Sequence, residues 1–249
     1  MLVTFIPCRK NSKSIKDKNL KPLCGKPLVA WTLEIAKSCG LERIVVNTDD
    51  QRIADIAISH GVEVQMRPTS LGKDNTSMFE LLRSEIFKLS PVPEHVLLLQ
   101  PTSPFRNANQ VNIALGYFLA NLDEYDSLIS VEKVPDKYHP AQVILSSGNE
   151  KRMAFGKLVS LKDKIKAFFT GTKHTEPVPG GVPLYHRLTR RQDFPEAYIP
   201  DGSIYLFKAM NLKGGTIYGL RTMLFESEGT LNINSPEDFE EAEKLCAQK

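Results

Sequence analysis

The sequence predicts an α/β fold with a doubly wound, mostly parallel sheet of the Rossmann-like type. Short runs rich in leucine or β-branched residues alternate with longer segments of helical periodicity through the first half of the chain. The apolar runs are nearly continuous, as expected of strands that are covered on both faces. Strands separated by helices of this length form parallel βαβ units with right-handed crossovers.

The first half of the chain supplies most of these elements. Strands are expected at residues 2–7, 43–48, 62–66, 95–100 and 127–133. The helical patterns between them cover residues 27–40, 49–61, 77–90 and 109–122. The first two of these helices end in a glycine, which is the residue that most often follows the last helical turn.

The second half is less regular. Residues 134–188 hold five prolines and a Gly-Gly pair with little periodicity, so we interpret them as a lobe inserted into a single domain that spans residues 1–249. Residues 197–210 predict a further strand. The last segment predicts a strand that runs to Asn234, followed by a helix that Ser235 caps and that Pro236 begins.

The composition indicates a soluble, cytoplasmic protein. Charged residues make up 24% of the chain and hydrophobic ones 41%, and no apolar run approaches the length of a membrane helix. The opening segment becomes charged too early for a secretory signal and predicts a buried strand instead. The spacing of the four cysteines does not suit a metal site, so we expect free thiols in a reducing compartment: Cys8, Cys24, Cys39 and Cys246.

The positive charge of the chain is concentrated in one loop. Of a net charge of +3, the segment from Arg9 to Lys26 holds seven basic residues against the single acid Asp17. This pattern predicts one local polyanionic ligand. No aromatic residue in the segment is available to stack on bases, which argues against a nucleic-acid-binding module.

Four polar segments follow predicted strands, where open α/β sheets bind their ligands. The basic loop after the first strand has no glycine pattern of a known phosphate loop, and a solvated charged loop is its alternative interpretation. Residues 66–77 offer further polar side chains, although Ser77 could simply cap the next helix. Two prolines hold the turn at 100–106, and an Arg pair at 190–191 could clamp a carboxylate.

These motifs, in this order and spacing, resemble the CMP-sialic acid synthetases (acylneuraminate cytidylyltransferases). The similarity covers nearly the whole chain, and LLQPTSP after the basic loop is its most specific element. The resemblance implies a fold of the nucleotide-diphospho-sugar transferase type and transfer of CMP from CTP to the anomeric hydroxyl of a nine-carbon acidic sugar, with Mg²⁺ as cofactor. It also implies a homodimer in which the subunits exchange the inserted lobe. A CMP-Kdo synthetase is similar but does not usually carry LLQPTSP.

The resemblance also assigns roles to individual residues. It implies that Arg9 and Lys18 are catalytic and that Gln100 and Arg191 bind the sugar, Arg191 through the carboxylate. The residues implied to bind the nucleotide are Arg9, Ser12, Lys18, Asn19, Arg67, Asp74 and Ser77.

One departure from the family pattern concerns the metal site. The family ends its last strand with an acidic pair, where this chain has Asn232 and Asn234. Carboxamides hold Mg²⁺ more weakly than carboxylates do. Asp201 stands where the family usually has asparagine, so a carboxylate could have moved to the neighbouring strand. The alternative is a nucleotide-binding relative that has lost catalysis.

Overall fold

The structure is a computed structural model, and it describes residues 1–135, 138, 145–146, 153–154 and 196–247. The chain divides into two compact units. One comprises Met1–Glu132 and Pro200–Lys249, and the other Lys133–Ile199. The second unit contains the predicted lobe at residues 134–188, most of which lies outside the described part, so its role in dimerisation stays a prediction.

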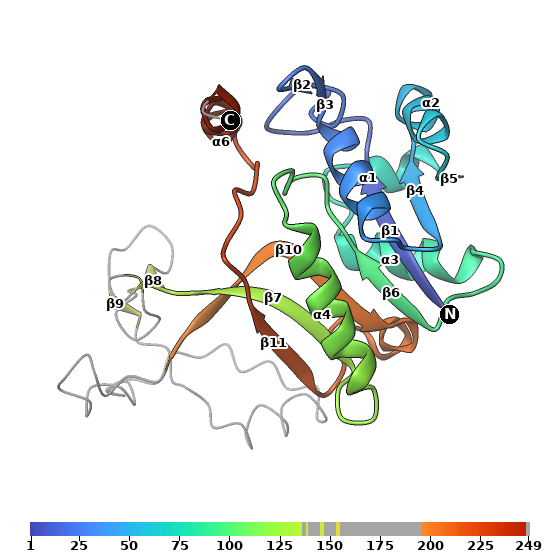
Figure 1. The fold of residues 1–249 in the computed structure, drawn as a ribbon, viewed down its shortest axis with the longest axis vertical. Helices are drawn as coiled ribbons and strands as arrows, with labels where there is room; N and C mark the ends of the chain where they lie inside the picture. Colours follow the sequence, from blue (N-terminus) through green and yellow to red (C-terminus); the bar gives the residue numbers. More distant parts are fainter. Residues whose placement is uncertain (136–137, 139–144, 147–152, 155–195, 248–249) are drawn as a thin grey trace. The chain divides into compact units, whose positions relative to one another are not determined.

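A seven-stranded sheet forms the centre of the fold (Figure 1), with the strand order β11-β7-β10-β6-β1-β4-β5. Four pairs of the described strands are parallel: β1 with β4, β1 with β6, β4 with β5 and β7 with β11. β10 runs antiparallel to β6. The predicted doubly wound, mostly parallel sheet is therefore confirmed. The bounds are β1 Leu2–Cys8, β4 Ile44–Thr48, β5 Glu63–Met66, β6 His95–Leu98, β7 Ser127–Lys133, β10 Tyr198–Lys208 and β11 Thr222–Glu226.

The helices confirm the predicted alternation with the strands. The four helices of the first half are α1 Leu28–Ser38, α2 Gln51–Ser59, α3 Met78–Glu85 and α4 Ala108–Ala120. The described part of the chain also contains the 3-10 helices η1 Thr69–Gly72, η2 Ile86–Lys88 and η7 Ala209–Gly214. Two small hairpins pair β2 Pro22–Leu23 with β3 Lys26–Pro27 and, in the second unit, β8 Leu145–Ser146 with β9 Met153–Ala154.

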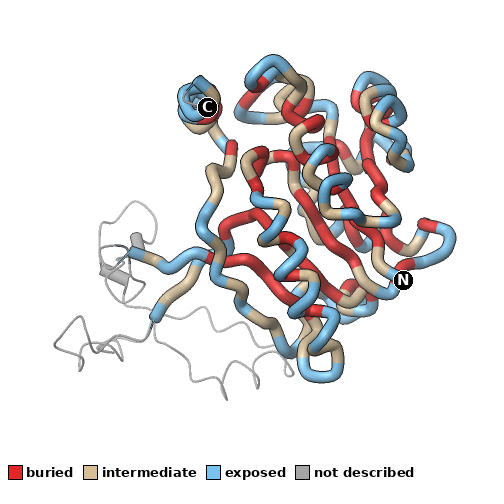
Figure 2. Tube along the Cα trace, viewed as in Figure 1, coloured by how far each residue is buried: buried red, intermediate tan, exposed pale blue. Residues whose placement is uncertain are grey.

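Period-two alternation in the strands divides the core between the two faces of the sheet. In β1, Phe5 packs with side chains of α3 and η2, whereas Ile6 packs with α1, α2 and α4. β6 repeats the pattern with Leu98 and Leu97. Figure 2 shows the central strands buried along most of their length, while the helices keep exposed outer sides. This covering of both faces explains why the strands were apolar without interruption.

The C-terminal segment differs in part from its prediction. The helix α6, Pro236–Ala247, forms as expected, and Ser235 and Asp238 bond each other's backbone N–H groups at its start. The predicted strand to Asn234 is wrong, because residues 230–234 have no strand structure. The Ile233 N–H donates instead to the carbonyl of Thr102, which belongs to a turn and offers no strand ladder. β11 was not predicted.

The expectation of four free thiols is also wrong. Cys8 and Cys39 are free, but Cys24 and Cys246 form a disulfide with their Cα atoms 5.9 Å apart. Packing of Phe239 of α6 against the apolar cluster around the β2–β3 hairpin brings the two cysteines together. None of the helices in the described ranges has the length and apolar character that a membrane crossing needs.

Candidate functional site

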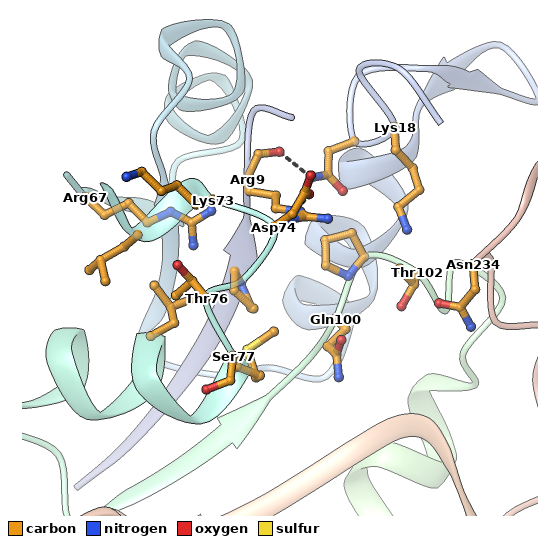
Figure 3. A pocket seen from close by; sticks show the side chains of 16 residues that line it. Arg9, Lys18, Arg67, Lys73, Asp74, Thr76, Ser77, Gln100, Thr102 and Asn234 are labelled. Carbon is orange, nitrogen blue, oxygen red and sulfur yellow. Dashed lines mark hydrogen bonds and ion pairs between the residues drawn. The ribbon is translucent and has the colours of Figure 1, made fainter. Parts of the chain in front are cut away.

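A pocket of about 290 Å³ lies beyond the carboxyl ends of β1, β5 and β6 (Figure 3). The chain reaches it from four separate segments, and three of these follow strands of the parallel sheet. The lining residues are Pro7, Arg9, Lys18, Asn19, Arg67, Leu71, Lys73, Asp74, Thr76, Ser77, Met78, Leu81, Gln100, Pro101, Thr102 and Asn234.

The charge of this pocket is strongly positive. Four of its side chains are cationic, namely Arg9, Lys18, Arg67 and Lys73, and Asp74 is the one carboxylate among the described lining residues. Cations converging on one concave surface raise the local concentration of an anionic ligand. The pocket is thus suited to a compact polyanion such as a polyphosphate.

The basic loop is held in place by hydrogen bonds within the loop and to its neighbours. Asn19 donates from Nδ2 to the carbonyl of Arg9 at 2.9 Å. Lys18 donates from Nζ to the carbonyl of Ile233 at 3.1 Å, which ties the loop to the segment before α6. Burial lowers the pKa of Lys18, and the nearby Arg9 lowers it further, while Asp238 acts in the opposite direction. Ser12 is absent from the lining residues of the pocket, so its nucleotide role stays a prediction.

The segment between β5 and α3 forms a second wall. Asp74 accepts a hydrogen bond from Nη1 of Arg9 at 2.8 Å, so this predicted nucleotide residue is ion-paired in the structure. Ser77 lines the pocket and also caps α3, in a reciprocal capping box with Glu80. The capping interpretation of Ser77 is therefore confirmed, and it does not remove the side chain from the pocket.

Arg67 is buried at the back of this wall, with only 2% of its side chain exposed. Its backbone N–H donates to the carbonyl of Thr48 at 2.9 Å, which extends the pairing of β5 with β4 by one residue. The guanidinium donates to Asn47 and Asp49, whereas Nε has no partner. Burial lowers the pKa of Arg67, and the Asp49 carboxylate partly offsets this.

The proline-bounded turn after β6 presents Gln100 and Thr102 to the pocket. Arg106, at the end of the turn, is buried and fixes it instead of lining the pocket. Its Nε donates to the carbonyl of Ser203 at 2.7 Å and its Nη2 to that of Gln100 at 2.9 Å. Burial lowers the pKa of Arg106 to about 10. The predicted sugar residue Arg191 lies outside the described residues.

Comparison with known proteins shows which family the chain belongs to. A model of the family described as "Cytidylyltransferase" matches residues 3–155 of the chain, which include three of the four pocket segments. The chain belongs to the cytidylyltransferase family. The match covers the basic loop, the wall before α3 and the turn after β6.

Individual relatives agree with this membership. An N-acylneuraminate cytidylyltransferase of Streptococcus agalactiae serotype III is 27% identical over 95% of this chain and 51% of the relative. A CMP-N,N'-diacetyllegionaminic acid synthase of Legionella pneumophila is 35% identical over 59% of the chain and 65% of the relative. The resemblance to acylneuraminate cytidylyltransferases is confirmed. The chain spans between 33% and 51% of the length of the first such relatives that it matches.

Among solved structures, the fold is similar to that of a CMP:2-keto-3-deoxy-manno-octonic acid synthetase complexed with CTP. The TM-score is 0.67 at 17% sequence identity, and the match covers 99% of this chain and 98% of the other. At this identity the likeness establishes a shared fold. It agrees with the predicted Rossmann-like fold.

The three residues considered for a metal site do not come together in the pocket. The Asp201 carboxylate already accepts hydrogen bonds from Ser130, Ser203 and Ser227. Asn232 donates to the Asp201 backbone carbonyl at 3.4 Å, and only Asn234 lines the pocket. The described residues hold no group of three histidine, cysteine or acidic side chains that could bind a metal. They therefore do not fit a Mg²⁺ site built from protein carboxylates.

Two charged residues at or near the pocket were not identified from the sequence. Lys73 lines the pocket. It lies beside Asp74 in the polar segment at residues 66–77, and this position is the signal that could have identified it. Asp49 accepts a hydrogen bond from the pocket residue Arg67 but does not itself line the pocket. Its sequence position indicated only the start of a helix, a role that the neighbouring Asp50 fills by capping α2.

Proposed function

We propose that this chain transfers CMP from CTP to the anomeric hydroxyl of a nine-carbon 2-keto acid sugar of the sialic, legionaminic or pseudaminic type. Pyrophosphate is the second product. The observation that carries the proposal is the pocket at the strand ends, with four cations against one carboxylate among its described residues. Membership of the cytidylyltransferase family and the similarity to synthases of CMP-linked acidic sugars support it.

In the proposed reaction the anomeric oxygen forms a bond to the α-phosphorus of CTP. The bond from that phosphorus to the oxygen bridging to the β-phosphorus breaks, and pyrophosphate leaves with the electron pair. The proton of the sugar hydroxyl passes to solvent. Such a transfer needs in-line positioning and positive charge around the phosphoryl oxygens, and Arg9 and Lys18 are the proposed sources of that charge.

The remaining roles follow the resemblance. We assign nucleotide binding to Ser12, Asn19, Arg67, Asp74 and Ser77 in addition to the two catalytic cations. Gln100 would contact the sugar, and Arg191 would pair with its carboxylate through a bidentate contact. A homodimer that exchanges the lobe at 134–188, and a requirement for Mg²⁺, remain predictions that rest on the resemblance alone.

A second candidate function is nucleotide binding without turnover. The observation that favours it is the hydrogen-bonded state of the Asp201 carboxylate, together with the neutral side chains of Asn232 and Asn234. This candidate predicts CTP binding with little dependence on Mg²⁺ and no release of pyrophosphate.

The deciding experiment measures pyrophosphate release from CTP in the presence of sialic, legionaminic or pseudaminic acid or Kdo, with and without Mg²⁺. Release with one nine-carbon acid is the expected result. Release with Kdo alone would reassign the substrate to a CMP-Kdo type of reaction. CTP binding without release across the whole panel would favour the binding protein.

A further inference from the structure

Asp49 is a buried carboxylate that the proposed reaction does not use. It directly follows β4, its side chain is 6% exposed, and it is not among the residues that line the pocket. Its Oδ1 accepts from the backbone N–H of Lys10 at 2.9 Å and from Nη2 of Arg67 at 3.4 Å. Lys10 and Arg67 follow β1 and β5, the two strands that flank β4, so one carboxylate joins three neighbouring strand ends.

A third segment packs against the same carboxylate. A Cβ atom built on Gly72 would lie 2.2 Å from Oδ2 of Asp49, which is closer than any real contact. Gly72 ends the η1 turn, and its neighbours Leu71 and Lys73 both line the pocket. The absence of a side chain at this position lets the turn lie directly on the Asp49 carboxylate.

Arg67 is the pocket residue that this arrangement orients. Asn47 accepts from its Nη1 at 3.2 Å, and Asn47 is itself held by Gln65 at 3.0 Å and by the buried Glu85 at 3.3 Å. With Asn47 and Asp49 holding the two Nη atoms, Nε is the donor without a partner on a side chain that lines the pocket. Leaving a buried donor unpaired is costly, so the contacts of Asn47 and Asp49 with the two Nη atoms are what hold this side chain in place.

We propose that Asp49 is a positioning residue for the nucleotide. Its carboxylate holds Arg67, the Lys10 backbone and the Gly72 turn in the arrangement that binds CTP, without touching CTP itself. The inference rests on the proposed function, because the contact between Asp49 and Arg67 affects CTP binding only if Arg67 binds the nucleotide.

The first test is Asp49→Asn. Asparagine keeps the shape and one acceptor oxygen for the Lys10 N–H but removes the charge that pairs with Arg67. A displaced binding group costs up to about a hundredfold, so we expect the Kd and KM for CTP to rise by about tenfold or more. The KM for the acidic sugar should change by less than about twofold, because the inference assigns no sugar contact to these residues.

Gly72→Ala tests the same contact without a change of charge. The added methyl group would displace the Asp49 carboxylate from Arg67, so the effect on CTP should have the same sign. Asp55→Asn on the exposed side of α2 and Gly116→Ala on α4 are the matched controls. A Cβ at Gly116 meets no atom within 4 Å, and both controls should keep the wild-type Kd for CTP.

A double-mutant cycle separates positioning from general stability. If Asp49 acts through Arg67, Asp49→Asn should change the Kd for CTP by less than about twofold in an Arg67→Ala background. A full loss in that background would overturn the inference, as would wild-type affinity in both Asp49→Asn and Gly72→Ala. Should Asp49→Asn fail to fold, Gly72→Ala takes its place in the cycle. Wild-type protein that neither binds nor consumes CTP would instead overturn the proposed function.

Discussion

Arg9 donates a hydrogen bond of 2.8 Å from Nη1 to the carboxylate of Asp74, which lies 65 positions further along the chain. The two side chains are 33% and 58% exposed, so water screens the pair and its contribution to stability is small. Its effect lies in position, because it links the loop after β1 to the wall before α3.

Arg9→Ala should lower the rate of pyrophosphate release by at least about a hundredfold, since it removes charge from the developing phosphoryl oxygens. Asp74→Asn should cost less than about tenfold, because the cation remains and loses only its partner. Steady-state kinetics measure both effects, with Arg83→Ala on the exposed surface of α3 as the control. A larger loss in Asp74→Asn than in Arg9→Ala would show that Asp74 is the more important contact.

Lys18 should give CTP binding an alkaline limit. Burial and the neighbouring Arg9 lower its pKa, so its ammonium group loses its proton at a lower pH than an exposed lysine does. Affinity for the triphosphate is therefore complete below this lowered pKa and falls as the pH rises through it. Calorimetric titration with CTP across alkaline pH measures the limit. Lys18→Arg keeps the charge and should move the limit upward, and an unmoved limit would assign it to another group.

Asn234→Asp should strengthen the binding of Mg²⁺. Asn234 lines the pocket, and Asp74, the one carboxylate among the described lining residues, is already paired with Arg9. A carboxylate at position 234 would give Mg²⁺, a hard cation, an anionic ligand that is not paired. We expect the Mg²⁺ concentration for half-maximal pyrophosphate release to fall by about tenfold, the lower end of the effect that residues around a bound metal have on its affinity. Asn112→Asp on the exposed side of α4 makes the same charge change away from the pocket. Equal responses in both variants would mean that Asn234 does not approach the metal.

The Cys24–Cys246 disulfide should stabilise the attachment of α6. Its removal should lower the free energy of unfolding by about 2–4 kcal/mol, the usual range for a native cross-link. Thermal unfolding with and without reductant measures the loss, and Cys246→Ser should be insensitive to reductant. Without reductant, the unfolded protein should expose two titratable thiols, Cys8 and Cys39. Four thiols under these conditions would contradict the bond.

The local patterns that predicted this fold reflect local causes. The alternation that places Phe5 and Ile6 on opposite faces, and the residues that start and end helices, act within a few positions. The pocket segments could be grouped because parallel strands deliver their carboxyl ends to one edge. Relationships across long separations had no such signal: Asp49 meets Arg67 across 18 residues, and Cys24 meets Cys246 across 222. The alternation of polar and apolar residues at 230–234 led to the wrong prediction of a strand, because this segment pairs with a turn and not with another strand.

The order of the sheet has a consequence for biosynthesis. β10 lies between β6 and β7, although it follows both in the chain. About 100 residues separate the end of β6 at Leu98 from the start of β10 at Tyr198, which is roughly 5–20 seconds of translation. During that interval the β6 edge has no antiparallel neighbour, and an open apolar edge is a template for aggregation. The nascent chain on the ribosome, more than the finished protein, is therefore the state in which this sheet is most vulnerable.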